Sequence, residues 1–313
     1  LSAVLVVKPG LNPGIDFKGG SEVTVTGVAD PSEGPGNDVL ADKDLSSGSS
    51  VTTMGASSVR IQTNELDKAQ LDELASSLAT AYDVDSGSVS ATTIGPTWSA
   101  DVTSKAARGL VIFFLLVGAL IWIYFRTWKM AAAALLALSH DIIVTIGIYA
   151  ASGFEVTPAT IIGVLTILGY SLYDTVVVFD KIRENTSHYE AQTRSTYAEL
   201  ANLAVNQTFI RSINTSVVGV LPVASLLVVG AFILGAGTLR DIALTLFIGM
   251  IAGTLSSIFL ATPLLVDLRS REKSIVEQAK RVEAARAQRV TQAGDDDEAL
   301  AAIVAAPAAS PLV

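Results

Sequence analysis

Five long apolar segments follow one another through the C-terminal two thirds of the chain. They lie at residues 108–125, 130–151, 157–179, 212–234 and 241–266. A membrane-spanning helix needs roughly 17–25 mainly apolar residues, and each segment is at or near that length. The pattern therefore predicts five transmembrane helices joined by polar connections, of which the longest covers residues 180–211.

A further apolar stretch, LSAVLVV, opens the chain at residues 1–7. It is too short to span a bilayer, and it lacks the charged start of a signal peptide. Because the chain begins with Leu, we interpret this stretch as the stub of a truncated first transmembrane helix, which brings the predicted total to six. The alternative is a buried strand of the domain that follows.

Residues 8–104 have the mixed pattern of a small folded domain. Alternation of apolar and polar residues predicts strands at residues 21–27, 58–63 and 88–94. Helical spacing predicts an amphipathic helix at residues 66–82. Residues 30–55 are rich in Gly, Ser, Pro and acids and show no periodicity, so we expect a mobile insertion there. The predicted fold class is a polytopic α-helical membrane protein, at residues 108–266, with a small α+β domain.

Composition supports a membrane protein with one acidic soluble part. Of the 313 residues, 50% are hydrophobic and 16% are charged, and the mean hydropathy is +0.50. The net charge of -9 arises within residues 8–104, which hold 14 acidic and 5 basic residues, while the remainder is balanced at 16 of each. An acidic domain of this kind excludes nucleic acid as a partner. The absence of cysteine excludes disulfides and thiolate metal sites.

Lys and Arg residues near the ends of the apolar segments predict the orientation of the chain. If the acidic domain is outside, nine of them lie at inner ends and four at outer ends. The positive-inside rule therefore predicts an extracytoplasmic domain and a cytoplasmic tail at residues 267–313. The tail begins as a basic, Ala-rich helical stretch and ends in an acidic run and an Ala/Pro segment. We expect a helix that lies on anionic lipid, touches an acidic partner or is solvated, followed by a disordered end.

One carboxylate, Asp174, lies inside an apolar segment. An Asp at the centre of a membrane helix costs roughly 2.5–3.5 kcal/mol, which makes it a candidate functional residue. It is six residues from the charged edge at Asp180, or about 9 Å along a helix. Thr166 and Tyr170 precede it at a spacing of four residues, so we expect these three side chains to line one seam between helices.

The segment at residues 130–151 carries an adjacent imidazole and carboxylate, His140 and Asp141. They lie near the middle of the bilayer, a dozen residues from Lys129. A carboxylate beside an imidazole is suited to proton transfer, because histidine exchanges its proton near neutral pH. For His140 a structural role is the preferred interpretation, and for Asp141 both roles stay open.

The segment at residues 212–234 opens with polar residues that include Asn214, and Arg211 immediately precedes it. Arg211 is predicted at the inner end of this helix, where its long side chain can extend toward the level of Asp174. We therefore expect Arg211 to be the cationic partner of Asp174. The alternative is that these polar residues only hold helices together.

Other kinds of site are weakly supported. The sequence has no Walker motif and no metal-ligand spacing around its two histidines, His140 and His188. Tyr173 and Asp174 match one half of the intramembrane aspartyl protease motif, but the other half is missing. We therefore predict that the chain is not an enzyme, needs no cofactor and draws energy from a partner or from the membrane potential.

Five stretches, in order along the chain, form a specific set. They read GIDFKGG, LSHDIIVTIG, GYSLYDTVVVFDKIREN, NQTFIRSINTS and RDIALTLFIGMIAGTLSSIFLATPLL, and they start at residues 14, 138, 169, 206 and 240. Together they resemble the SecF branch of the SecD/SecF family of bacterial protein-export membrane proteins, within the RND superfamily. The sequence departs from that family in its truncated first helix, in the length of residues 30–55 and in DKIRE where DRIRE is usual.

The resemblance implies an RND-type six-helix bundle that works with a second subunit, SecD. The two subunits are expected to assist the SecYEG channel and SecA late in export, using the proton-motive force to draw an unfolded polypeptide across the bacterial plasma membrane. Matched residue by residue, Asp174 falls on the family's proton-pathway Asp, Arg211 on its functionally important Arg and Asp141 on the Asp of its HD pair.

Two other functions stay open on the residues themselves. One is an RND-type half-transporter that exports a small molecule or an ion, and the other is an assembly scaffold that moves no protons. Co-purification with a second six-helix subunit and an export channel would favour protein export over the half-transporter. Neutralising Asp174 would change only the yield of the complex if the chain were a scaffold.

Overall fold

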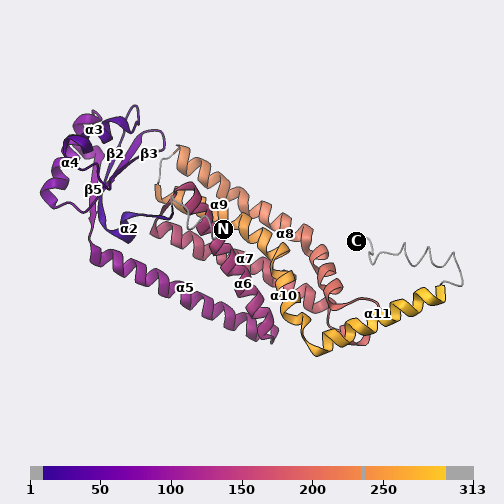
Figure 1. Cartoon of the computed structure of the whole chain (residues 1–313). Helices are drawn as coiled ribbons and strands as arrows, with labels where there is room; N and C mark the ends of the chain where they lie inside the picture. Colours follow the sequence, from indigo (N-terminus) through magenta and orange to yellow (C-terminus); the bar gives the residue numbers. More distant parts are fainter. Residues whose placement is uncertain (1–9, 234–236, 294–313) are drawn as a thin grey trace.

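The computed structural model describes residues 10–233 and 237–293. Figure 1 shows an elongated molecule with a small α+β domain at one end, a bundle of long helices in the middle and a single projecting helix at the other end. The predicted helix stub at residues 1–7 and the predicted disordered end beyond residue 293 lie outside the described residues.

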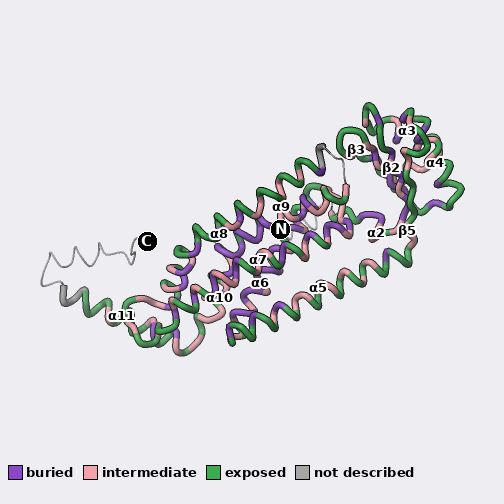
Figure 2. Tube along the Cα trace, turned by 180° about the vertical axis from the view of Figure 1, so that it is seen from behind, coloured by how far each residue is buried: buried purple, intermediate pink, exposed green. Residues whose placement is uncertain are grey.

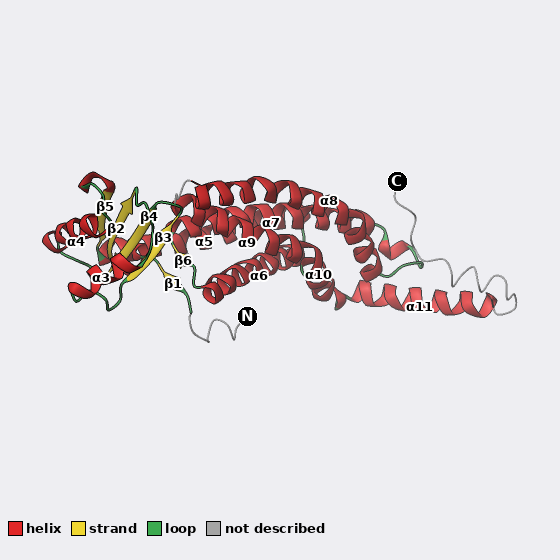
Figure 3. Ribbon diagram, turned by 90° about the horizontal axis from the view of Figure 1, so that it is seen from above, coloured by secondary structure: helices red, strands yellow, loops and turns green. Residues whose placement is uncertain are grey.

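The α+β domain is built on a four-stranded antiparallel sheet with the strand order β3-β4-β2-β5 (Figure 3). The strands are β2 (Gly20–Thr26), β3 (Ser50–Met54), β4 (Ser58–Thr63) and β5 (Val89–Ile94). Alternate residues of the central strands point into the core, as Val23 of β2 and its partner Ile61 of β4 do. Helix α4 (Lys68–Ala81) supplies Leu74 and Leu78 to this core, which confirms the predicted amphipathic helix.

Residues 30–55, predicted to be a mobile insertion without periodicity, form helix α3 (Gly34–Asp42) and the edge strand β3, so the expected lack of regular structure is wrong. Leu40 of α3 and Val51 of β3 are buried in the domain core, and Val39 of α3 packs against the same core. The hydroxyl of Tyr82 also accepts a hydrogen bond from the amide of Gly36 at 3.0 Å. The few apolar residues of this Gly- and Ser-rich stretch follow no regular spacing, so tertiary contacts decide its structure.

Within the described residues, five helices are long and apolar enough to cross a membrane. They are α5 (Pro96–Phe125), α6 (Trp128–Ser152), α7 (Pro158–Asn185), α8 (Tyr197–Leu227) and α9 (Gly237–Phe259). A π-helical segment, η3 (Val228–Ile233), continues α8, and α10 (Ala261–Ser270) follows α9. The multi-pass helical architecture with an α+β domain confirms the predicted fold class.

The helices extend beyond the apolar segments that predicted them. Helix α5 begins directly after β5, with Gly95 as its N-cap, so it runs from the α+β domain into the bundle without a flexible linker. Helix α8 begins at Tyr197 behind a capping box made by Thr196 and Glu199. Arg211 therefore lies inside a helix and not at its end, because hydropathy detects only the part of a helix that lies in hydrocarbon.

Helices α7 and α9 form the centre of the bundle, where small residues let the two backbones approach closely. A Cβ atom added at any of three glycines would collide with the opposite helix, at Gly163 with Thr245, at Gly249 with Ile167 and at Gly253 with Ser171. Gly249 and Gly253 are four residues apart, the spacing by which membrane helices often pack. This contact decides which side chains of α7 face α9.

Helices α5 and α8 lie at the periphery of the bundle, and many of their residues are exposed (Figure 2). Only 11% of the most apolar part of each is buried, compared with 56% for the span that contains α9. Leu115 and Ile123 of α5 and Leu221 of α8 are among the exposed side chains. These surfaces are available to lipid or to another membrane protein.

The tail begins as helix α11 (Lys273–Ala293), which the basic, Ala-rich sequence predicted. It is held against the connection between α7 and α8. Arg286 pairs with Glu199 at 2.6 Å, and Gln278 Nε2 donates to the carbonyl oxygen of Ser195 at 2.8 Å. Two more arginines donate to backbone carbonyl groups of the same connection, Arg281 and Arg289. Part of the basic character of α11 therefore serves an internal contact.

We expect Arg286→Ala to loosen this contact, because it removes the ion pair with Glu199 and a hydrogen bond to the carbonyl oxygen of Arg194. The pair is half exposed, so the loss is about 0.2–1 kcal/mol. Hydrogen exchange of the α11 amides should become faster in the intact protein. Lys280→Ala, which removes an exposed cation of the same helix, is the matched control. Equal exchange rates in the two variants would contradict the role of Arg286.

A short strand pair joins the α+β domain to the bundle. Strand β1 (Asn12–Pro13) pairs in parallel with β6 (Glu155–Val156), which lies in the connection between α6 and α7. Helix α2 (Ile15–Lys18) follows β1 and leads into β2. The carboxylates of Asp16, Glu22 and Glu155 are thereby brought near one another.

We expect Asp16→Asn to stabilise the α+β domain at neutral pH. Burial and the carboxylates of Glu22 and Glu155 raise the pKa of Asp16 above its ordinary value of 3.8, and Arg60 opposes the shift. The folded state therefore favours the protonated acid, and the contribution of Asp16 to stability is present at low pH and lost as the pH rises through its raised pKa. Hydrogen exchange in the domain should be slower in the variant at neutral pH and equal in both proteins below the ordinary pKa. Equal protection at neutral pH would refute the prediction.

Candidate functional site

Asp174 lies in the centre of the bundle, on the side of α7 that packs against α9. The residue is 3% exposed, and the Ser257 hydroxyl of α9 donates to Asp174 Oδ2 at 3.4 Å. The buried hydroxyl of Ser212, from α8, lies beside the same carboxylate without a well-aligned hydrogen bond. The acid is thus surrounded by hydroxyl groups from two neighbouring helices.

A second buried carboxylate, Asp141 of α6, belongs to the same region and is 1% exposed. Ser171 of α7 donates to Asp141 Oδ2 at 2.6 Å. Ser171 precedes Asp174 by three residues, or about one helical turn. His140 Nδ1 lies 3.4 Å from Asp141 Oδ1, and its ring is partly exposed. The structure therefore brings the two acids into one polar seam, connected through α7.

Further hydroxyl contacts extend the seam between α7, α8 and α9. The Ser216 and Thr254 hydroxyls are 2.7 Å apart, and the Tyr170 hydroxyl donates to the carbonyl oxygen of Thr215 at 2.8 Å. Ser212 and Ser216 belong to the polar opening of residues 212–234 that the sequence pointed out, whereas Ser171, Thr254 and Ser257 were not singled out. The signals of these hydroxyl residues in the sequence were a spacing of four residues on α8 and a run of small residues on α9.

Arg211 and Asp174 do not meet. Arg211 is exposed on α8, and its Nη2 donates to the Tyr173 hydroxyl at 3.3 Å. Tyr173 is 51% exposed, whereas the neighbouring Asp174 is turned inward. Among the described residues, no cation forms an ion pair with Asp174 within 4.0 Å. The structure therefore does not show the direct pair that the sequence led us to expect.

The three polar residues that were predicted to line one face of α7 differ in their exposure. Thr166 is exposed and donates to the carbonyl oxygen of Ile162, Tyr170 is half-buried, and Asp174 is buried. Successive residues of a helix are about 100° apart, so each step of four residues turns the direction by about 40°. The exposed polar residues of α7 and α8 form what we call the outward polar patch, which consists of Thr166, Tyr173, Arg211 and Asn214.

The seam has the chemistry to bind and pass protons. An ionised carboxylate that is shielded from water and has no Lys or Arg in an ion pair with it is costly, and protonation removes that cost. Hydroxyl groups can both donate and accept hydrogen bonds, so those around Asp141 and Asp174 suit either state of the acids. Over the described residues, no group of three His, Cys, Asp or Glu side chains could hold a metal ion.

Two family models match the chain. One, described as protein export membrane protein SecD/SecF, C-terminal, matches residues 74–271, which is more than half of the chain. The other, the SecD/SecF GG motif, matches residues 4–27. The first model spans both buried acids and every hydroxyl of the seam, and the second contains the GIDFKGG stretch.

Similar proteins carry related names. The protein translocase subunit SecF of Streptomyces coelicolor is 48% identical over 288 residues, which are 89% of this chain and 74% of that protein. The protein of the same name from Mycobacterium leprae is 42% identical over 300 residues, 90% of this chain and 63% of that protein. These are names of transport subunits, in agreement with the prediction that the chain is not an enzyme.

A solved structure has the same architecture. The crystal structure of SecDF from Thermus thermophilus, described as a translocon-associated membrane protein, matches with a TM-score of 0.74 and 30% identity. The match covers 86% of this chain and 36% of that chain. A second crystal structure, of SecDF in a super-membrane-facing form, matches with a TM-score of 0.56 and 29% identity.

Proposed function

This chain belongs to the SecD/SecF family of protein-export membrane proteins, and we propose that it is the SecF-type accessory subunit of a bacterial protein translocase. It is a multi-pass membrane protein. In the proposed function, it uses the proton-motive force to promote the late stage of protein translocation. Protons are the coupling ion, and no other cofactor is needed.

The observation that carries the proton-coupled part of this proposal is the environment of Asp174. It is buried at a helix contact, it receives a hydroxyl hydrogen bond from Ser257, and it forms no ion pair among the described residues. Loss of its proton creates a charge in a region of low dielectric, which favours a rearrangement that brings water or a cation closer. A change of charge at Asp174 can therefore drive a change in the packing of α7, α8 and α9.

A SecD-type protein is the expected partner, because 58% of this chain matches part of the Thermus protein that is named SecDF. The outward polar patch supports a partner at α7 and α8, since exposed polar groups in a lipid-facing position are costly. We propose that Arg211 lies at this interface. A movement of the helices there brings the charge of Arg211 toward the seam. The Tyr173 hydroxyl holds Arg211 at 3.3 Å in the present arrangement.

The chain is proposed to lie in the bacterial plasma membrane, with the α+β domain outside and α11 in the cytoplasm, as the distribution of Lys and Arg indicates. The SecYEG channel, SecA and the translocating unfolded polypeptide are its proposed working partners. The α+β domain is the part that would meet the emerging polypeptide.

Proteoliposomes that contain the channel, SecA and the SecD-type partner test this function. A polypeptide arrested late in translocation should be completed by an imposed proton gradient, without ATP, only when this chain is present. Equal completion without the chain would refute the proposal. Accumulation of a small substrate in cells that lack the chain would favour a half-transporter. Reduced complex yield with unchanged proton flux would favour a scaffold.

A further inference from the structure

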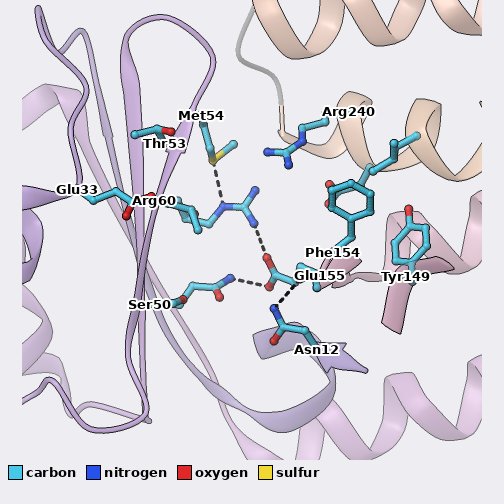
Figure 4. Close-up of a pocket in the computed structure, with 15 residues that line it drawn as sticks. Asn12, Glu33, Ser50, Thr53, Met54, Arg60, Tyr149, Phe154, Glu155 and Arg240 are labelled. Atoms are coloured by element: carbon cyan, nitrogen blue, oxygen red, sulfur yellow. Dashed lines mark hydrogen bonds and ion pairs between the residues drawn. The ribbon is translucent and has the colours of Figure 1, made fainter. Parts of the chain in front are cut away.

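One side chain of the α+β domain, Arg60 of β4, contacts several separate parts of the molecule (Figure 4). Its Nη1 donates to Glu155 Oε2 at 2.8 Å, in the connection between α6 and α7. Its Nε lies 3.0 Å from Met54 Sδ on β3 and 3.8 Å from Glu22 Oε2 on β2. The guanidinium therefore ties two strands of the domain to the helical bundle.

The same arginine also lies against the start of α9. A Cβ atom added at Gly237 would be 2.5 Å from Arg60 Nη2 and would collide with Met54 as well. Glycine at this position thus lets the β3–β4 hairpin rest directly on the first turn of α9. The domain is seated on the helix that carries Ser257 at the seam.

Glu155 is the counterpart of Arg60 in the bundle, and it is held from two sides. Besides Arg60, Gln62 Nε2 donates to Glu155 Oε1 at 2.7 Å, so both carboxylate oxygens are bound by β4. The side chains of Arg60 and Glu155 are 13% and 19% exposed. A charge-assisted pair that is largely shielded from water is stronger and more directional than a surface pair.

The connection that carries Glu155 leads directly to the seam helices. Two residues later, Thr157 is the N-cap of α7, and its hydroxyl donates to Asp241 Oδ2 of α9 at 3.1 Å. Any shift between α7 and α9 therefore reaches this connection within one or two residues. A cavity of about 280 Å³ lies beside it, with Arg60, Glu155 and Arg240 among its lining residues, and leaves room for movement (Figure 4).

Among the described residues, the chain also passes from the domain into the bundle at Gly95, where β5 leads into α5. An attachment at one point lets a domain swing, whereas two attachments at separate points determine its orientation. The Arg60–Glu155 pair supplies a second point, in the connection between α6 and α7. It is reinforced by the pairing of β1 with β6.

We propose that Arg60 and Glu155 form a coupling joint through which a rearrangement of α7 and α9 changes the orientation of the α+β domain. Arg60 is then a positioning residue that acts far from Asp174. This inference rests on the proposed function for its driving force, the change of charge at Asp174. The joint itself is a structural claim that can be tested without export.

The structural test uses spin labels on the intact complex with its SecD-type partner. The chain has no cysteine, so Ser76→Cys on α4 and Ser152→Cys at the end of α6 place two labels on opposite sides of the joint. We expect a narrow distance distribution in the parent protein and a broader or shifted one after Arg60→Ala. The control is Lys43→Ala, which removes a 2.6 Å ion pair with Glu73 inside the domain. An unchanged distribution in Arg60→Ala would overturn the joint.

The functional test measures translocation completed by a proton gradient in proteoliposomes. Arg60→Ala and Glu155→Ala should each lower it by about fivefold or more, and the double variant should be no worse than either single variant, because both act through one contact. Lys43→Ala should leave it unchanged. If the alanine variants fail to fold, the same measurement is made on Glu155→Gln, which keeps the shape of the side chain.

The outcomes separate the joint from the proposed function. Normal translocation in Asp174→Asn refutes proton coupling through Asp174 in the proposed function, whatever the spin labels show. A loss of translocation in Asp174→Asn, together with normal translocation in a folded Arg60→Ala protein, refutes the coupling. Additive losses in the double variant would also refute it, because independent residues do not share one contact.

Discussion

Asp174→Asn is expected to abolish translocation driven by a proton gradient while the complex still assembles. Asn has nearly the size of a protonated Asp and can accept the Ser257 hydroxyl, which lies 3.4 Å from Asp174 Oδ2, but it cannot release a proton. Each proton that crosses the membrane supplies about 2.3 kcal/mol per 100 mV, and this input would be lost. The proton-driven rate should therefore fall to the level measured without a gradient.

The matched control for this prediction is Asp180→Asn on the same helix. Asp180 is exposed, and the Tyr124 hydroxyl donates to its Oδ1 at 3.4 Å. Both variants should co-purify with the SecD-type partner in normal yield, and only Asp174→Asn should lose the response to the gradient. A normal response in Asp174→Asn would eliminate Asp174 as the proton-binding group. A collapse of complex yield would instead assign it a structural role.

Gly253→Ala is expected to destabilise the contact between α7 and α9. The added Cβ would lie 2.9 Å from Ser171 Cβ, so α7 and α9 would have to separate. Overpacking of this kind costs about 1–3 kcal/mol. The shift would also disturb the 2.6 Å hydrogen bond between Ser171 and Asp141, so the polar seam should lose its arrangement together with stability.

Gly109→Ala on α5 is the control, because an added Cβ there meets no atom within 4 Å. It reports the gain in helix propensity on replacing Gly by Ala, about 1 kcal/mol, without a steric effect. The free energy of unfolding in bicelles should be lower for Gly253→Ala than for Gly109→Ala by about 1–3 kcal/mol. Equal stabilities would show that α7 and α9 do not need the close contact at Gly253.

The two acids illustrate how far sequence reasoning reached the candidate site. Asp174 and Asp141 were identified because a charged group in an apolar segment is costly, which is a property of composition alone. Their hydroxyl partners were not assigned to them, because serines and threonines are common in membrane helices and become informative only when a carboxylate faces them. Arg211 was placed at the level of Asp174, but the rotation of α8 turns it toward Tyr173.

The joint at Arg60 could not be predicted from the sequence of the α+β domain either. Nothing in the local sequence of β4 distinguishes Arg60 from an ordinary surface charge on a strand. Its partner Glu155 is far away in the chain, in a short connection between two predicted membrane helices. A contact between such distant residues depends on how the domain is seated on the bundle, and short-range patterns carry no information about that.

The sequence by itself determined the number of apolar spans after residue 100, the acidic α+β domain, the buried acids and the family resemblance. Hydropathy, charge and motif spacing are local properties, so they can be read without knowing which residues are in contact in the folded chain. The tertiary structure decided the folding of residues 30–55, the hydroxyl partners of Asp174, the outward position of Arg211 and the seating of Arg60. Each of these depends on the rotation and close approach of elements, which packing contacts such as the one at Gly253 fix.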